Sequence, residues 1–189
     1  MKFKILFLLI ALFTSINSSK TITCIVETTE GSIVVELYAD KAPVTVANFL
    51  KYVDGGLYEN SSFFRVTTPE NEATRTEKIE VIQGGTLTAE KQLPPIEIET
   101  TEKTGINHLD GTISMARSGP NSATSSFFIC INEQPALDFA GKRNPDGYGF
   151  AAFGKVIKGM DVVRKIQKME SKKQQLVNPV AILTIKRLE

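Results

Sequence analysis

Residues 111–131 read GTISMARSGPNSATSSFFICI, which is two short apolar segments separated by a polar loop. The apolar segments, 112–116 and 127–131, have the length and the β-branched or aromatic content of strands. The loop consists of small, polar and turn-forming residues. It carries polar side chains that a rigid sheet would present at its surface, where binding sites usually lie: Arg117, Ser118, Asn121 and Ser126. The pattern predicts two strands that hold a binding loop.

The chain before this stretch predicts a hairpin followed by a helix. Residues 21–27 and 32–38 alternate between apolar and polar side chains, with a turn between them. Asp40-Lys41-Ala42-Pro43 is a typical helix start, and Gly55-Gly56 a typical end. Within these limits the apolar residues recur at helical spacing: Val46, Phe49, Leu50 and Val53.

The remaining segments predict more strands and a second helix. A helix is expected to begin at Met160-Asp161-Val162, and residues 67–79, polar and charged, are expected to form a surface insertion with a helical turn around 72–78. Strand-like segments occur at 61–66, 79–82, 96–98, 150–156 and 180–185. About eight strands and two helices without βαβ alternation predict a mainly β fold, an antiparallel barrel or sandwich with helices at its ends.

The first 18 residues have the pattern of a secretory signal peptide. A basic start is followed by the apolar run Ile5 to Phe13 and by small polar residues. A membrane anchor would need about 20 apolar residues, and a lipoprotein anchored through Cys24 lacks the small residues that usually precede a lipidated cysteine. We therefore expect residues 1–18 to be removed, leaving one domain of residues 19–189 with no membrane span.

Charge and cysteine content narrow the class of protein further. Without the two lysines of the predicted signal peptide, 20 basic residues face 21 acidic ones, so nucleic acid is not expected as a partner. Cys24 and Cys130 lie in apolar segments and have no C-x-x-C spacing. They are expected to be buried thiols, with a disulfide as the alternative that export would permit.

Few residues suit acid–base or nucleophilic catalysis. The single histidine, His108, lies in a turn-like segment and is expected to be a solvated loop residue. A histidine-based zinc site is excluded, and ordinary secreted hydrolases become improbable. Arg65 stands out instead, because it follows Phe63-Phe64 in an apolar strand. A charged side chain in such surroundings normally has either an ion-pair partner or a functional role.

Several blocks of sequence follow one another along the chain: Phe63-Phe64-Arg65-Val66, Ile82-Gln83-Gly84-Gly85, Gly111 to Arg117, Asn121 with Ser125 to Ile129, Leu137-Asp138, Phe153 to Val156, and Gly159 to Val163. Taken together and in this order, they resemble the cyclophilin family of peptidyl-prolyl isomerases, most closely the compact exported bacterial members. The resemblance extends from about residue 21 to residue 188 and implies an eight-stranded antiparallel barrel closed by two helices.

The resemblance implies a site. Arg65 matches the catalytic arginine, Gln83 the glutamine that binds the substrate backbone, and Ala116 with Arg117 the strand end that holds the peptide by main-chain bonds. Phe127, Val81 and Leu137 match walls of the proline pocket. The chain departs from the usual family residue at several substrate-binding or pocket positions: Phe64 (often histidine), Glu80 (phenylalanine), Ser126 (glutamine), Ala136 (tryptophan or phenylalanine) and Phe150 (histidine or tyrosine).

The function that the resemblance implies is isomerisation of Xaa–Pro bonds in folding exported proteins, without cofactor or metal. The expected partners are proline-containing polypeptides, and the expected state is a monomer in the bacterial periplasm, with secretion as the alternative. Two other functions remain open: a weakly or non-catalytic chaperone module that holds proline-containing segments in the same groove, and a barrel with a small-molecule cavity. The altered pocket positions lower the expected rate.

Overall fold

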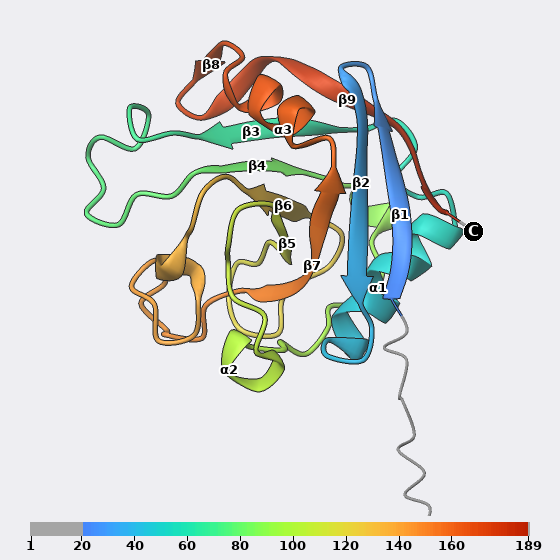
Figure 1. Ribbon diagram of the computed structural model, residues 1–189, viewed down its shortest axis with the longest axis horizontal. Helices are drawn as coiled ribbons and strands as arrows, with labels where there is room; N and C mark the ends of the chain where they lie inside the picture. The colour runs from blue at the N-terminus through green and yellow to red at the C-terminus, as the bar shows by residue number, and fades with distance from the viewer. Residues whose placement is uncertain (1–20, 189) are drawn as a thin grey trace, which may run out of the picture.

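The structure is a computed structural model that describes residues 21–188. Eight antiparallel strands form a closed ring in the order β1-β2-β7-β5-β6-β4-β3-β9, and β9 pairs with β1 to complete it (Figure 1). The ring strands are β1 (Thr21–Thr28), β2 (Gly31–Tyr38), β3 (Ser61–Thr67), β4 (Val81–Gly84), β5 (Thr112–Met115), β6 (Phe127–Cys130), β7 (Ala151–Lys158) and β9 (Gln175–Arg187). The predicted eight-stranded antiparallel barrel is confirmed.

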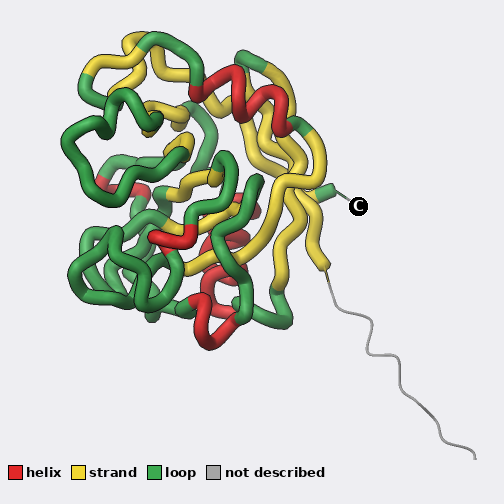
Figure 2. Tube along the Cα trace, turned by 60° about the vertical axis from the view of Figure 1, so that its left-hand side comes forward, coloured by secondary structure: helices red, strands yellow, loops and turns green. Residues whose placement is uncertain are grey.

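Several predicted elements differ in detail. A short ninth strand, β8 (Ser171–Lys172), forms a hairpin with β9 and lies outside the ring. Residues 96–98, predicted as an edge strand, make only the single bridge between Ile96 and Ala123. The helical turn predicted within 72–78 is wrong, because this segment folds as turns and bends (Figure 2).

The structure has three α-helices within residues 21–188, one more than predicted. The two expected ones are α1 (Pro43–Asp54) and α3 (Met160–Gln167), and the third, α2 (Thr101–Thr104), is a single turn. Two short 3₁₀ turns, Ala89–Lys91 and Pro135–Leu137, complete the set. None of these helices is long and apolar enough to cross a membrane. The predicted signal peptide, residues 1–18, lies outside the described part of the chain.

Helix α1 begins where the sequence predicts but is capped from elsewhere in the chain. Proline is favoured in the first turn because its missing N–H would have no helical partner. The Glu99 carboxylate accepts hydrogen bonds from the main-chain nitrogens of Val44 and Thr45, at 3.1 and 2.8 Å. A negative charge at this end is favourable because unpaired N–H groups make it positive. The cap therefore ties α1 to the loop before α2.

Two hydrophobic clusters lie on opposite faces of the same strands. Successive side chains of a strand alternate between faces. In β6, Phe127 and Ile129 belong to the large cluster inside the barrel, while Phe128 and Cys130 belong to a small cluster on its outside. The small cluster also contains Ile79, Val81 and Leu137. The outer cluster is where the site lies.

Both cysteines are buried and unpaired, as expected. Cys24 belongs to the cluster inside the barrel and Cys130 to the outer one. Burial raises the pKa of the Cys24 thiol to about 11 and also raises that of Cys130. Both thiols are therefore protonated and act as small apolar side chains.

Candidate functional site

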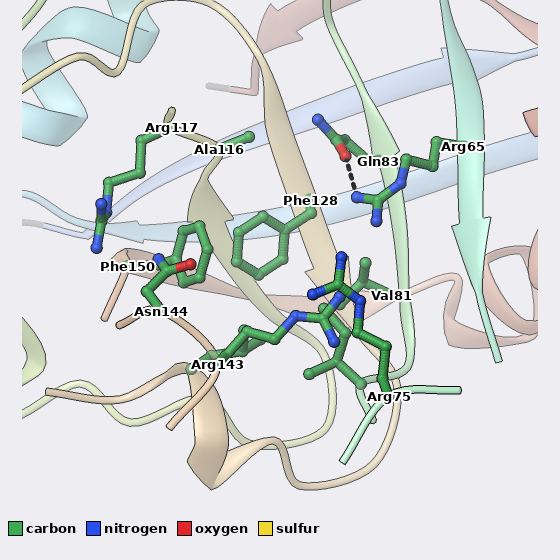
Figure 3. A pocket seen from close by; sticks show the side chains of 12 residues that line it. Arg65, Arg75, Val81, Gln83, Ala116, Arg117, Phe128, Arg143, Asn144 and Phe150 are labelled. Atoms are coloured by element: carbon green, nitrogen blue, oxygen red, sulfur yellow. Dashed lines mark hydrogen bonds between the residues drawn. The ribbon is translucent and has the colours of Figure 1, made fainter. Parts of the chain in front are cut away.

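A cavity of about 240 Å³ opens on the outside of the barrel, over strands β4 and β6 (Figure 3). It combines apolar walls with arginine side chains. The lining residues are Arg65, Arg75, Ile79, Val81, Gln83, Ala116, Arg117, Phe128, Leu137, Arg143, Asn144 and Phe150. Of the residues that the sequence proposed for a substrate site, seven line this cavity together: Arg65, Val81, Gln83, Ala116, Arg117, Leu137 and Phe150.

The aromatic wall of the cavity is Phe128, not Phe127. The Phe127 ring is fully buried inside the barrel and packs edge to face against Phe49, Tyr58 and Phe63. Phe128 points outward, 4 % exposed, and meets the Phe150 ring edge to face at 5.3 Å. The sequence assignment was off by one position, and in a strand such a shift moves the side chain to the opposite face.

Arg65 faces the cavity because strand β3 is interrupted just before it. Regular alternation would place residues 63 and 65 on one face, and Phe63 is fully buried inside the barrel. The pairing of β3 with both β4 and β9 shifts register between Phe63 and Arg65, which is the mark of a β-bulge. The bulge turns Arg65 outward and returns Val66 to the interior. Phe64, within the bulge, is half-buried and does not line the cavity.

The Arg65 guanidinium is held by two amide oxygens. Its Nη1 donates to Gln83 Oε1 at 2.8 Å, and its Nε and Nη2 both donate to Gln174 Oε1, at 3.0 and 2.6 Å. One hydrogen on each of Nη1 and Nη2 is left for a ligand. Burial and the charges of Arg143 and Arg75 lower the pKa of Arg65, opposed by Glu72, but an arginine stays protonated. The arrangement presents a fixed cationic donor beside an apolar surface.

Gln174 is a site residue that the sequence did not reveal. It lies in the two-residue turn between β8 and β9, where Lys173 and Gln174 both have positive φ, 48° and 74°. Such turns normally use asparagine or glycine, because other side chains are strained there. The turn brings Gln174 to Arg65, and its Nε2 donates to Glu72 Oε1 at 3.0 Å. The segment shows no sequence signal beyond its polarity.

Ser126 acts on the site through Gln83. Gln83 Nε2 donates to Ser126 Oγ at 3.1 Å, and Ser126 Oγ donates to the Gly84 carbonyl at 3.1 Å. These bonds orient the Gln83 amide with its oxygen toward Arg65. Ser126 itself does not line the cavity.

The Arg117 side chain closes one side of the cavity. Its guanidinium forms two hydrogen bonds with the Asp146 carboxylate, donates to the Gly149 carbonyl at 2.7 Å and lies over the Phe150 ring. This pairing lowers the pKa of Asp146, chiefly through the hydrogen bond from Arg117. The loop that carries Phe150 is thereby fixed to the end of strand β5.

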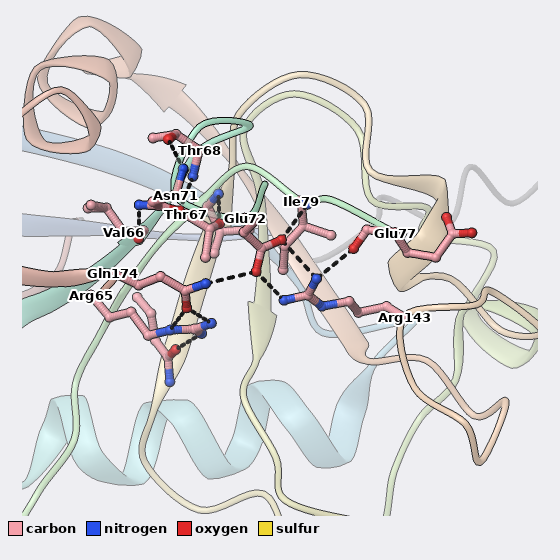
Figure 4. A network of polar contacts seen from close by, with 12 residues as sticks. Arg65, Val66, Thr67, Thr68, Asn71, Glu72, Glu77, Ile79, Arg143 and Gln174 are labelled. Atoms are coloured by element: carbon pink, nitrogen blue, oxygen red, sulfur yellow. Dashed lines mark hydrogen bonds and ion pairs between the residues drawn. The ribbon is translucent and has the colours of Figure 1, made fainter. Parts of the chain in front are cut away.

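Residues 67–79 form the opposite wall and are not merely a surface insertion. Glu72 is buried and forms a two-point ion pair with Arg143, at 2.5 and 2.8 Å (Figure 4). Its Oε2 also accepts a hydrogen bond from the Ile79 main-chain nitrogen at 2.9 Å. Burial raises the pKa of Glu72, but these hydrogen bonds and the nearby arginine charges more than offset it, so its pKa is lowered. The carboxylate is the centre of this wall.

Ile79 takes the place that the sequence assigned to Glu80. Ile79 lines the cavity as part of the outer apolar cluster. The Glu80 carboxylate points elsewhere, accepting hydrogen bonds from Asn132 and Gln167. The carboxylate that appeared to disrupt the apolar pocket therefore lies outside it. Ala136 likewise borders a different surface depression.

His108 is buried, which overturns the expectation of a solvated loop residue. Its ring is 1 % exposed, contacts Asp138 Oδ1 at 2.7 Å and Ser114 Oγ at 3.0 Å, and stacks on Phe128. The three side chains have the connectivity of a serine hydrolase triad, but Ser114 is fully buried. No substrate could reach its hydroxyl, so the cluster supports the cavity from within.

Comparison with known proteins agrees with this geometry. The family described as cyclophilin type peptidyl-prolyl cis-trans isomerase/CLD matches residues 23–187. Peptidyl-prolyl cis-trans isomerase A of Dickeya dadantii (strain 3937) is 38 % identical over 149 residues, covering 76 % of this chain and 70 % of the relative. Peptidyl-prolyl cis-trans isomerase B of Escherichia coli (strain K12) is 38 % identical over 143 residues, with coverages of 74 % and 80 %.

A solved structure shows the same fold. The crystal structure of a cyclophilin type peptidyl-prolyl cis-trans isomerase from Cryptosporidium parvum superposes with a TM-score of 0.71 at 21 % identity. The match covers 89 % of this chain and 98 % of that one. Taken with the family match and the bacterial relatives, the barrel and its outer cavity show that the chain belongs to the cyclophilin-type peptidyl-prolyl cis-trans isomerases.

Proposed function

We propose that Arg65 is the catalytic group of this isomerase and that its substrates are Xaa–Pro bonds in exported proteins as they fold. The observation that carries the proposal is the position of the guanidinium. It is fixed by Gln83 and Gln174 at the edge of an apolar surface made by Val81, Phe128 and Leu137, with N–H hydrogens left to donate.

The mechanism follows from the electronic structure of the amide. Rotation about the C–N bond has a barrier of about 20 kcal/mol because the nitrogen lone pair is delocalised into the carbonyl. In the twisted state the lone pair is localised on nitrogen, where an N–H of Arg65 can donate to it. The donor then binds the transition state more strongly than the planar ground state, which is the condition for catalysis. The apolar wall excludes water that would otherwise stabilise the polar planar form.

The barrier lowering that a modest acceleration requires is close to what a single preorganised hydrogen-bond donor contributes. A thousandfold acceleration requires about 4 kcal/mol of barrier lowering. One fixed donor in a water-excluded site contributes about 3–4 kcal/mol. Arg65 could thus supply most of a modest acceleration, and the shape of the pocket would have to supply any more.

The structure bears on the alternative, a weakly or non-catalytic module that only holds proline-containing segments. That alternative drew on Glu80 and Ala136 as disruptions of the pocket. Glu80 faces Asn132 and Gln167, Ile79 completes the apolar wall, and Ala136 lies outside the cavity. These positions favour the catalytic function.

An exchange assay on Xaa–Pro peptides tests the proposal. The wild-type protein should accelerate cis–trans exchange, and Arg65→Ala should lower the rate at least a hundredfold, about 2.7 kcal/mol, while peptide affinity changes only a few fold. Arg65→Lys should recover little, because an ammonium cannot bond Gln83 and Gln174 in the same fork. The melting temperature of each variant is measured on the same sample. A folded Arg65→Ala protein with undiminished activity would refute the assignment.

The cellular setting is proposed from residues 1–18. We expect export with removal of this segment, a periplasmic or secreted monomer, and a mature chain that begins near Ser19 or Lys20. N-terminal sequencing of the protein from an envelope fraction is the measurement. Retention of Met1 there would contradict the proposal.

A further inference from the structure

The cavity lining is rich in arginine. It contains Arg65, Arg75, Arg117 and Arg143 but no carboxylate. Two of these arginines are neutralised by carboxylates behind the wall, Arg143 by Glu72 and Arg117 by Asp146. Arg65 is held by amide oxygens, which carry no charge. Two positive charges therefore face the cavity without a paired carboxylate among the described residues.

Arg75 is the less constrained of the two. It lies in the insertion 67–79 and is exposed. Its main-chain nitrogen donates to the Glu72 carbonyl at 2.9 Å, but its side chain forms no hydrogen bond or ion pair with any described residue. Its side chain extends to the cavity beside Arg143 and Val81 (Figure 3). Burial and the charge of Arg143 do most to lower the pKa of Arg65, and the charge of Arg75 adds a smaller effect in the same direction, so the guanidinium groups of Arg65 and Arg75 repel each other. A bound anion would relieve that repulsion.

We propose that this isomerase prefers Xaa–Pro segments that carry an anionic group next to the proline, and that Arg75 is the residue that selects them. The inference rests on the proposed function, because the same cavity would hold the proline ring. The apolar wall of Val81, Phe128 and Leu137 receives the ring, and Arg75 at its rim receives the anion. The anion is a carboxylate or phosphate, and an acidic side chain, a phosphorylated side chain or a chain end can each supply it.

The size of the preference follows from the position of Arg75. An ion pair at an exposed rim contributes up to about 1 kcal/mol, a factor of about five. Such a pair is screened by salt, with a Debye length of about 3 Å at 1 M. The preference should therefore be about fivefold at low salt and should nearly vanish in 1 M NaCl.

A series of peptides measures the preference for an anionic group beside proline. Tetrapeptides with both ends blocked carry glutamate, glutamine, lysine or phosphoserine on one side of proline, and a second set carries them on the other side. A further neutral peptide ends in a free carboxylate after proline. We expect kcat/KM to rank glutamate above glutamine above lysine in at least one set. A larger effect for phosphoserine or for the free chain end would identify that source of the anion instead.

Reversing the charge of residue 75 distinguishes recognition of the anion from damage to the cavity wall. Arg75→Glu should reverse the order, making lysine peptides the better substrates, a gain that mere disruption of the fold cannot produce. Lys78→Glu makes the same charge change in the same exposed segment but outside this cavity, and it should leave the glutamate-to-lysine ratio unchanged.

The possible failures are distinguishable. Acceleration of all peptides to an equal extent would overturn the anion preference and leave the isomerase function intact. A preference that Arg75→Glu and Lys78→Glu alter equally would remove the role of Arg75, because only a general field would then remain. Absence of acceleration for every peptide would defeat the proposed function, and the inference with it.

Discussion

The two sides of the cavity are built by different kinds of interaction. Gln83 and Phe128 project from paired strands, β4 and β6, whose register is fixed by main-chain hydrogen bonds. The opposite wall, residues 67–79, consists of turns and bends, and the buried ion pair of Glu72 with Arg143 joins it to the loop before β7. On the strand side a side chain can change without moving the backbone. On the insertion side the backbone position itself depends on side-chain charge.

The largest expected effect concerns the strand side. Phe127→Ala should lower the free energy of unfolding by about 3–5 kcal/mol, because it leaves a cavity inside the barrel. Phe128→Ala should cost less stability, because its ring already borders a cavity, but should lower kcat/KM at least tenfold. Denaturant unfolding and the peptide exchange assay on both variants are the measurements. Loss of activity in a stable Phe127→Ala protein would reverse the assignment of the two rings.

On the insertion side, Glu72→Gln should cost about 3 kcal/mol of stability, because Arg143 would keep its buried charge without a partner. Activity should fall as well, since Ile79 and Gln174 lose their anchor. Glu77→Gln is the matched control: Arg143 contacts only the Glu77 main-chain carbonyl, so this change should be nearly neutral. Equal effects of the two substitutions would show that the ion pair does not hold the wall.

Acid should weaken the same wall. The pKa of Glu72 is lowered in the folded state, so its contribution to stability is complete above the ordinary carboxyl pKa of 4.5 and is lost as the pH falls below it toward the folded value. Thermal melts between pH 7 and pH 3 should show a steeper loss for the wild type than for Glu72→Gln. Parallel curves for the two proteins would contradict this role of Glu72.

The smallest expected effect is on the rate near neutral pH. The proposed mechanism transfers no proton, so kcat/KM should change by less than about twofold between pH 6 and pH 8. A bell-shaped profile, typical of an acid and base pair, would argue against the mechanism.

The sequence predicted the strand side better than the insertion side, for physical reasons. The sequence assigned Phe127 to the pocket wall, although Phe128 lines it, because an apolar strand pattern does not say which of two adjacent residues faces inward. The bulge before Arg65 was not visible in the sequence, although an arginine between buried residues signalled that something unusual occurs there. Apart from the bulge, the strand side follows from local patterns, because strand geometry turns the alternation of residues directly into side-chain direction.

The contacts of Glu72, Gln174 and His108 could not be predicted. Each depends on a partner distant in sequence: Arg143 for Glu72, Arg65 for Gln174, and Asp138 for His108. A polar residue in a turn-rich segment is normally solvated, and nothing local distinguishes the exceptions.

Closure of the barrel between its first and last strands also constrains how the protein can be made. Strand β9 pairs with both β1 and β3, and the contact between Cys24 and Arg187 spans almost the entire described chain. While the ribosome is still synthesising β9, both partner strands present open edges, which are the parts of a sheet most prone to pair with other molecules. Contacts of such sequence separation also form slowly. The unfolded chain therefore remains vulnerable to aggregation until residues 175–187 have paired with β1 and β3.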